Sequence, residues 1–155
     1  MHAEIADYAL LGNTRTAALV SRAGSIDWLC APRFDSPAFF ACIVGTEKHG
    51  RWLLTPLAAP VASRRCYRAD TLVLETEYEC SDGAVTVVDA MPIQDGPAAT
   101  VARLVIGRGG RVQMRMEFIP RFGYGLHPPR LSRAAGDLMA VCGPDTLRLS
   151  SPVGA

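Results

Sequence analysis

The chain has 155 residues, of which 49% are hydrophobic and 20% are charged, and its formal net charge is +1 at pH 7. This length is typical of one domain, and the hydrophobic share is large enough for a buried core, which excludes a disordered chain. The nearly balanced charge provides no large basic field, so the composition argues against a nucleic-acid partner or an anionic membrane surface.

Short runs rich in valine and leucine, most of them closed by a glycine, predict antiparallel strands along the chain. The first pair is residues 16–22 and 25–30, joined by a turn at Ala23-Gly24. One helical candidate follows at residues 36–44, where Ser36 would cap the helix and Pro37 suits its first turn. We expect at most this one short helix.

The clearest predicted hairpin covers residues 71–90. Its first strand is residues 71–80, in which the residues of the two faces alternate along the sequence, and its return strand is residues 84–90. Asp82-Gly83 between them favours a type I′ turn. The alternation places Leu72, Leu74, Thr76, Tyr78 and Cys80 on one face and Val73, Glu75, Glu77 and Glu79 on the other.

Two further hairpins complete the predicted fold. Residues 101–106 and 111–119 would pair around Gly109-Gly110, and residues 137–142 would pair with 146–150. Eight or more short strands at regular spacing, with almost no helical periodicity, predict an all-β antiparallel sandwich.

The cysteine pattern bears on cofactors and compartment. The five cysteines are odd in number and widely spaced, without a Cys-x-x-Cys pair, which predicts buried thiols in a cytosolic protein and no metal site. The N-terminus lacks a basic segment followed by an apolar one, and no apolar run approaches the ~20 residues needed to span a bilayer. We therefore expect a cytoplasmic protein with no membrane association and no cofactor.

Residues 25–40 are the most informative stretch for function. Trp28 offers a flat apolar face, and the planar Arg33 guanidinium suits a carboxylate, either Asp27 or Asp35. Pro32 and Pro37 stiffen the backbone. The segment is either a rigid polar loop presented to a ligand or another domain, or a corner loop in which Trp28 belongs to the core.

Two other stretches have weaker functional signals. Glutamates two apart on a strand lie about 7 Å apart, within the separation that inverting glycosidases use, but Glu75, Glu77 and Glu79 are better explained as a solvated strand face. Arg121 and Tyr124, within the glycine-containing residues 120–125, belong to either a docking loop or an ordinary connection between sheets. The sequence contains no nucleophile elbow, phosphate-binding loop or zinc-protease motif, and we assign no catalytic residue.

Several segments together resemble a known family. They are residues 5–13, 15–21, 25–40, 70–76, 88–92, 120–125 and 143–145, which include Ile5-Ala6-Asp7-Tyr8-Ala9-Leu10-Leu11-Gly12-Asn13 and Pro32-Arg33-Phe34-Asp35-Ser36-Pro37. This set resembles the N-terminal β-sandwich domain of glycoside hydrolase family 15, in its bacterial trehalase-like and glucoamylase-like members. The resemblance covers most of residues 1–155 and implies a supersandwich-like fold, with fewer strands than the family usually has.

The resemblance also implies a cytoplasmic, inverting α-glucoside hydrolase that acts on trehalose or short α-linked glucans. Its two catalytic glutamates would lie in a helical α/α barrel, and no part of this sequence matches that barrel. We therefore expect a non-catalytic domain that packs on the barrel and supports the rim of its active site. The residues expected at the substrate rim or the domain contact are Asp27, Trp28, Arg33, Asp35, Arg121 and Tyr124.

The sequence leaves two other roles open. One is a free-standing carbohydrate-binding module, although aromatic residues make up only 7% of the chain. The other is self-association through open strand edges, which invite pairing with a second copy.

Overall fold

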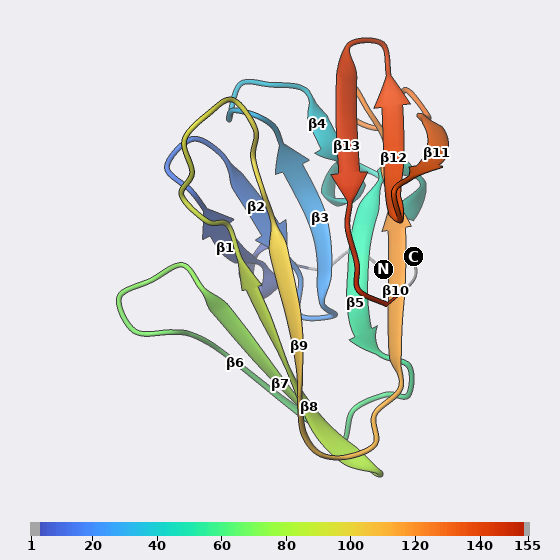
Figure 1. Ribbon diagram of the computed structural model, residues 1–155. Coiled ribbons are helices and arrows are strands. Elements are labelled where there is room, and N and C mark those ends of the chain that lie inside the picture. Colours follow the sequence, from blue (N-terminus) through green and yellow to red (C-terminus); the bar gives the residue numbers. More distant parts are fainter. Residues whose placement is uncertain (1–3, 154–155) are drawn as a thin grey trace.

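The structure is a computed structural model that describes residues 4–153, and within that range it contains thirteen β-strands, three short 3-10 turns and no α-helix. The strands form three antiparallel sheets (Figure 1). The large sheet has the order β1-β2-β3-β5-β10, with β4 paired to β3, and the other two have the orders β6-β7-β8-β9 and β11-β12-β13. The predicted all-β antiparallel fold is confirmed.

Each sheet draws on strands from separate parts of the chain. The large sheet comprises β1 (Ala9–Gly12), β2 (Ala17–Val20), β3 (Ser25–Cys30), β4 (Ala38–Phe40), β5 (Arg51–Pro56) and β10 (Met114–Ile119). The four-stranded sheet comprises β6 (Ala62–Tyr67), β7 (Leu74–Cys80), β8 (Gly83–Ala90) and β9 (Ala102–Gly110). The three-stranded sheet comprises β11 (Arg130–Ala134), β12 (Asp137–Cys142) and β13 (Asp145–Leu149). The 3-10 turns are η1 (Ile5–Asp7), η2 (Cys42–Val44) and η3 (Glu47–His49).

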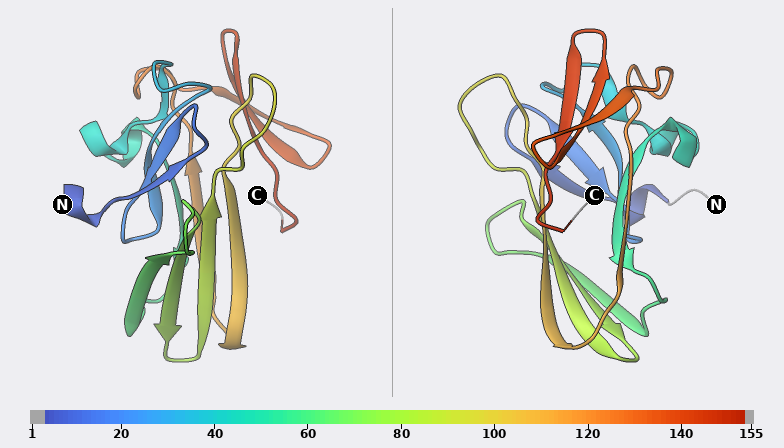
Figure 2. Two further views of the ribbon diagram at one scale, coloured as in Figure 1. Left: turned by 90° about the vertical axis from the view of Figure 1, so that its left-hand side faces the viewer. Right: turned by 45° about the vertical axis from the view of Figure 1, so that its right-hand side comes forward.

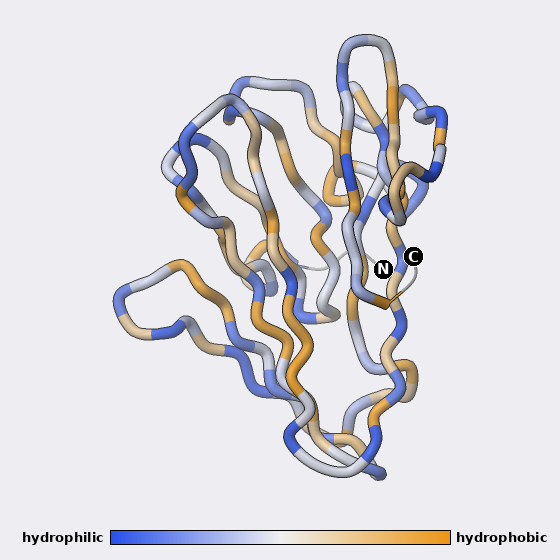
Figure 3. Tube along the Cα trace, viewed as in Figure 1, coloured by the Kyte–Doolittle hydropathy of each residue, from blue (hydrophilic) through white to orange (hydrophobic). Residues whose placement is uncertain are grey.

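The core lies between the large sheet and the four-stranded sheet, which form two layers (Figure 2). Leu11, Val20, Ile26 and Phe40 from the large sheet pack with Leu74 of β7. Farther along, a second cluster joins the large sheet to the other layer through Leu54, Tyr78, Val85 and Val87. Hydrophobic stretches along β8 and β9 are visible as orange in Figure 3. Burial of the side chains in the two clusters is the main force that holds the two layers together.

The arginine of a buried ion pair also connects the two layers. Arg103 of β9 donates hydrogen bonds to Asp89 of β8 at 2.8 and 3.2 Å, and both side chains are 1% exposed. The same guanidinium donates to the carbonyls of Trp52 and Gly24 at 2.7 and 2.8 Å, and its central carbon lies 5.3 Å from the centre of the Trp52 ring. Both buried charges thus have hydrogen-bond partners, as a buried charge requires: Asp89 is paired with Arg103 within its own sheet, and Arg103 also donates across the interface.

The hairpin predicted at residues 71–90 is confirmed, with two corrections: its first strand begins at Leu74, which leaves Leu72 exposed outside the strand, and its turn differs. Leu74, Thr76 and Tyr78 are buried, and Glu77 and Glu79 are exposed. Cys80 pairs with Gly83, so the turn residues are Ser81-Asp82 and not Asp82-Gly83. Gly83 has no positive φ and belongs to β8, so the predicted type I′ turn is wrong.

The predicted hairpin of residues 101–119 is also wrong. Both strands exist, but β9 pairs with β8 whereas β10 pairs with β5 of the other layer. Residues 111–113 therefore cross between sheets. Gly110 is paired with Gly83 at the end of β9, where a side chain would clash with the backbone of Asp82, so the glycine permits the pairing of β9 with β8.

The helix predicted at residues 36–44 is replaced by strand β4 and the 3-10 turn η2. The physical reason is that three consecutive side chains of this segment are buried in different directions. Ala38, Phe39 and Phe40 are all buried, and each belongs to a different hydrophobic cluster. A strand paired with β3 can distribute three consecutive side chains in this way, so tertiary packing overrides the local capping signal.

The third sheet covers one end of the molecule. Its predicted pair, β12 with β13, is confirmed, and β11 adds an edge strand that the sequence pattern did not predict. Ala140 and Leu147 pack with Phe39 and Phe122, whose rings meet edge to face at 4.7 Å between centres. Arg64 and Arg65 lie on β6, which is an edge strand of the four-stranded sheet.

Candidate functional site

Three loops meet at one end of the large sheet: residues 13–16, 31–37 and 91–101 (upper left in Figure 1). Hydrogen bonds join them. The Phe34 amide donates to the Arg15 carbonyl at 3.1 Å, and the Arg15 guanidinium donates to the Gly96 carbonyl. Residues from three separate parts of the chain therefore form one continuous surface at this end.

Arg33 and Asp35 form an ion pair at the tip of the middle loop. The guanidinium donates two hydrogen bonds to the carboxylate, at 2.8 and 3.2 Å, and both side chains are well exposed. This contact lowers the pKa of Asp35, mainly because Arg33 donates a hydrogen bond to its carboxylate. Of the two partners that the sequence left open for Arg33, the structure pairs it with Asp35.

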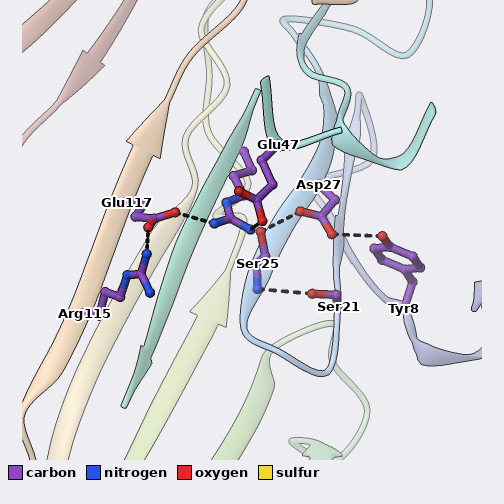
Figure 4. Close-up of polar contacts among 8 residues, drawn as sticks. Tyr8, Ser21, Ser25, Asp27, Glu47, Arg115 and Glu117 are labelled. Atoms are coloured by element: carbon purple, nitrogen blue, oxygen red, sulfur yellow. Dashed lines mark hydrogen bonds and ion pairs between the residues drawn. The ribbon is translucent and has the colours of Figure 1, made fainter. Parts of the chain in front are cut away.

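Asp27 has a different environment, because it is 6% exposed within the β3 strand. The pairing of β2 with β3 shifts by one residue here: Leu19 lies opposite Trp28 but Val20 lies opposite Ile26. Such a bulge redirects the side chain of the extra residue. Asp27 accepts hydrogen bonds from the Tyr8 hydroxyl at 2.9 Å and the Ser25 hydroxyl at 2.5 Å (Figure 4).

The Asp27 carboxylate affects its neighbours. The pKa of Tyr8 is raised by burial and by its hydrogen bond to Asp27. Burial, together with the nearby Asp27 charge, raises the pKa of the Cys42 thiol to about 11. Asp27 is thus held in a structural network that attaches the segment before β1 to strand β3.

A second polar network lies on the same face of the large sheet, over β5 and β10 (Figure 4). Arg51 donates to Glu47 at 2.9 Å and also to Glu117, which accepts a further bond from Arg115. The pKa of Glu117 is lowered, chiefly by its hydrogen bond from Arg51. The Nε of Arg51 is buried and has no partner within the described residues.

Trp28 and Tyr124 lie side by side on the outer face of the large sheet, which is the face that points away from the core. Ala18 and Leu29 face the core, so the adjacent pair, Leu19 and Trp28, points away from it. The Trp28 and Tyr124 rings are 6.0 Å apart between centres and tilted by 38°. Trp28 also packs against a small cluster that includes Ala38. The structure therefore brings together two residues that are far apart in the sequence.

The loop that carries Tyr124 has a special backbone. Gly123, Tyr124 and Gly125 have φ angles of 60°, 62° and 94°, so a tyrosine occupies a conformation that normally favours glycine. Side chains at the two glycines would contact the side chains of His127 and His49. Backbone strain of this kind needs support from its surroundings and is concentrated at functional sites. Here it holds the Tyr124 ring, which is 47% exposed, beside Trp28.

Arg121 lies at the start of the same loop but is not part of the aromatic pair. Its amide donates to the Phe39 carbonyl at 3.0 Å, and its guanidinium donates to the carbonyl of Pro120 at 2.8 Å. The Cβ of Arg121 also lies close to Gly50. Arg121 thus joins the loop to β4 and to the segment before β5.

Sequence reasoning missed two residues of the loop surface. Phe34 is 64% exposed between Arg33 and Asp35, and Arg15 faces it from the neighbouring loop. The signal available in the sequence was a phenylalanine placed between two charged residues. Within residues 4–153, no group of three histidine, cysteine or acidic side chains gathers as a metal ligand set, and no helix is long and apolar enough to cross a membrane.

Comparisons with known proteins identify the family of this chain. A family model described as trehalase-like, N-terminal matches residues 2–154. This chain belongs to the trehalase-like N-terminal family. The resemblance identified from the sequence is therefore confirmed at the level of the trehalase-like domain.

Curated relatives of this trehalase-like domain are much longer. The trehalase of Mycobacterium tuberculosis is 41% identical over 87 residues, which cover 56% of this chain and 13% of that protein. Trehalase 2 of Sulfolobus acidocaldarius is 35% identical over 120 residues, 77% of this chain and 19% of the relative. The trehalase of Thermoplasma volcanium is 29% identical over 150 residues, which cover 93% of this chain and 24% of that protein. This chain spans a quarter or less of the length of these relatives, and no solved structure matches it.

Proposed function

We propose that this chain is the non-catalytic N-terminal domain of a cytoplasmic, inverting α-glucoside hydrolase of the trehalase or glucoamylase type. It would pack on a helical catalytic barrel and support the rim of its active site. The family match and the names of the relatives support the substrate class. The much greater length of those relatives supports a separate catalytic part.

The observation that carries the proposal is the strained loop that holds Tyr124 against Trp28 on the outer face of the large sheet. Exposed apolar side chains occur in the segments around this pair, among them Val44 of η2 at 67% and Leu126 at 75%. In the left-hand view of Figure 2, η2 and η3 lie on the opposite side of the large sheet from β9. An exposed aromatic side chain fixed by the backbone suits contact with a second domain, because little conformational entropy is lost on binding.

The acidic residues argue against a catalytic role for the domain alone. An inverting glycosidase needs two carboxyl groups that face each other across a substrate, one of them with a raised pKa. Glu77 and Glu79 lie on the exposed face of β7, Glu75 pairs with Arg68, and Asp27 is buried in hydrogen bonds. This arrangement supports the assignment of catalysis to another part of the parent protein.

Glucose release from trehalose and maltooligosaccharides by the purified 155-residue chain tests the proposal. We expect no turnover from a chain whose folding is verified by its circular dichroism. Turnover would place a catalytic pair within these strands and overturn the proposal.

A chimera tests the supporting role. Residues 1–155 would replace the matching N-terminal region of the Thermoplasma volcanium trehalase, with which they align over 150 residues. We expect Tyr124→Ala and Arg33→Ala to lower the activity or the melting temperature of the chimera. The control is Leu57→Ala, an exposed side chain outside these loops. Unchanged kinetics and unchanged stability in both variants would remove these residues from the domain contact.

A specific observation also supports self-association as a second candidate function. Within the described residues, strand β9 is hydrogen-bonded only to β8, and its other edge is open. Leu104 and Val105 on this strand are 58% and 40% exposed. Open edges of this kind pair readily with another strand.

A further inference from the structure

The loops at the end of the large sheet enclose a shallow hollow of about 460 Å³, lined by Thr14, Arg15, Arg33, Phe34 and Asp35. This volume falls in the range of small-molecule sites in proteins, about 300–1,000 Å³. The hollow is separate from the aromatic pair on the outer face, since neither Trp28 nor Tyr124 lines it. No residue of the Asp27 or Glu117 hydrogen-bond networks lines the hollow. The Arg33–Asp35 ion pair does form part of its wall.

The walls of the hollow are fixed before any ligand binds. The Asn13 side chain accepts hydrogen bonds from the amides of Arg15 and Thr16, at 3.1 and 3.0 Å. In the facing loop, the Ser36 amide donates to the Arg33 carbonyl, and the Ser36 hydroxyl accepts from the Arg33 amide, both at 3.2 Å. A site that is already ordered loses little entropy when it binds a small ligand.

The lining combines two kinds of group that together suit a sugar. Phe34 presents an aromatic ring that is 64% exposed, against which the apolar face of a pyranose can pack. The Arg33–Asp35 pair beside it offers planar donors and a carboxylate acceptor within one fixed unit. Adjacent hydroxyls of a sugar both donate and accept hydrogen bonds, so a paired cation and anion match them better than a single charge would.

The other principal hollow provides a comparison. It has a volume of about 600 Å³, lies near the ends of β5 and β7, and is lined by residues that include Leu57, Asp82 and Arg111 but no aromatic side chain. Size alone therefore does not distinguish the two hollows. Of the two, only the first has an exposed aromatic ring next to a paired arginine and aspartate.

We propose that the hollow lined by Arg15, Arg33, Phe34 and Asp35 binds one glucosyl unit of a neutral α-linked disaccharide, with the sugar ring packed on Phe34. Asp35 accepts hydrogen bonds from sugar hydroxyls, and Arg33 and Arg15 donate to them. The choice of α-glucosides as the ligand class rests on the proposed function, whereas the position and chemistry of the site rest on the lining residues.

The test uses the full 155-residue chain, labelled with ¹⁵N and titrated with trehalose, with maltose, and with sorbitol as a polyol that lacks a pyranose ring. We expect saturable amide shifts at residues 13–16 and 33–36 with a disaccharide, and none with sorbitol. Phe34→Ala should weaken binding by roughly five- to tenfold through loss of the ring contact. Leu57→Ala, in the other hollow, should bind like the unchanged chain.

Three results would overturn the site: no saturable shift at tens of millimolar disaccharide, an equal response to sorbitol, or unchanged binding by Phe34→Ala. Because Phe34 is exposed, this variant should fold normally, which its spectrum checks directly. Failure of the sugar site and failure of the proposed function give different results. Loss of the sugar site would leave the Tyr124 chimera result intact, and glucose release by the chain alone would overturn the supporting role but not the sugar site.

Discussion

At the scale of single residues, the fold places several ionisable groups in contrasting environments. Glu117 is held by Arg51 and Arg115, and Cys42 lies beside buried Asp27, while Cys66 is exposed on an edge strand. These contrasts arise from tertiary structure, because the three groups lie on different elements that have different surroundings. They make the titration and reactivity of individual side chains measurable tests of the structure.

The Glu117 carboxylate should make stability sensitive to acid. Its pKa in the folded state is lowered from the ordinary value of 4.5, so this contribution is complete above pH 4.5 and is lost as the pH falls through the folded-state pKa. We expect Glu117→Gln to be less stable than the unchanged chain at neutral pH but to lose less stability on acidification. Urea unfolding midpoints across this range measure the effect. Glu77→Gln on the exposed face of β7 is the control, and equal pH slopes for all three proteins would contradict the assignment.

The five thiols should differ in reactivity. Cys66 is exposed, whereas Cys30 is buried and Cys42 has a pKa of about 11. Since the thiolate is the reactive form, Cys66 should react first with a disulfide reagent at mildly alkaline pH. Cys66→Ser should remove the fast phase of the reaction. A fast phase that survives this substitution would indicate that another cysteine is more accessible than the structure implies.

At the scale of elements, strand β9 is held in place by Arg103. Replacing Arg103 by methionine would leave Asp89 buried without its partner and would also remove two hydrogen bonds to the facing layer. We expect a loss of about 3–5 kcal/mol of unfolding free energy. Denaturant unfolding measures it, and Arg130→Met on exposed strand β11 is a control expected to change stability by less than about 0.5 kcal/mol.

A double variant separates the charge from the packing. Asp89→Leu combined with Arg103→Met removes both charges. The double variant should therefore lose less unfolding free energy than the sum of the losses in the two single variants. Strict additivity would mean that the two side chains do not depend on each other.

Local pattern predicted the elements with short-range partners better than those with distant ones. The β2–β3, β7–β8 and β12–β13 pairs were predicted, because alternation and turn residues lie within a few positions of one another. The pairing of β10 with β5 was not, because nothing near residues 111–113 indicates which sheet the next strand joins. The helix expected at residues 36–44 failed for a related reason: contacts with three separate clusters decide its conformation.

The candidate site was predicted only in part, for the same physical reason. The Arg33–Asp35 pair could be expected from two residues in one loop. The contact of Trp28 with Tyr124, and the position of Arg15 opposite Phe34, depend on how distant loops come together. The burial of Asp27 follows from a one-residue shift in strand pairing, which the sequence pattern does not reveal.

At the scale of the whole molecule, the open edge of β9 leads to a prediction about assembly. If this edge pairs with a second copy, the chain should form a dimer whose population rises with concentration in light-scattering measurements. Leu104→Lys should prevent the dimer, because a charge on an open edge opposes strand pairing. Ile93→Lys, in an exposed loop, is the matched control. A monomer at every concentration would exclude self-association through β9.

The return of the chain from β9 to β10 has a consequence for the order of events during synthesis. Met114 pairs with Pro56, so the large sheet lacks its last strand until every strand of the four-stranded sheet has already been made. As the chain leaves the ribosome, β5 therefore has an unpaired edge through the whole translation of residues 57–113. Contacts between positions so far apart slow folding, and an exposed edge during that interval is open to wrong partners. The vulnerable period of this protein is thus set by the delay between making β5 and making β10.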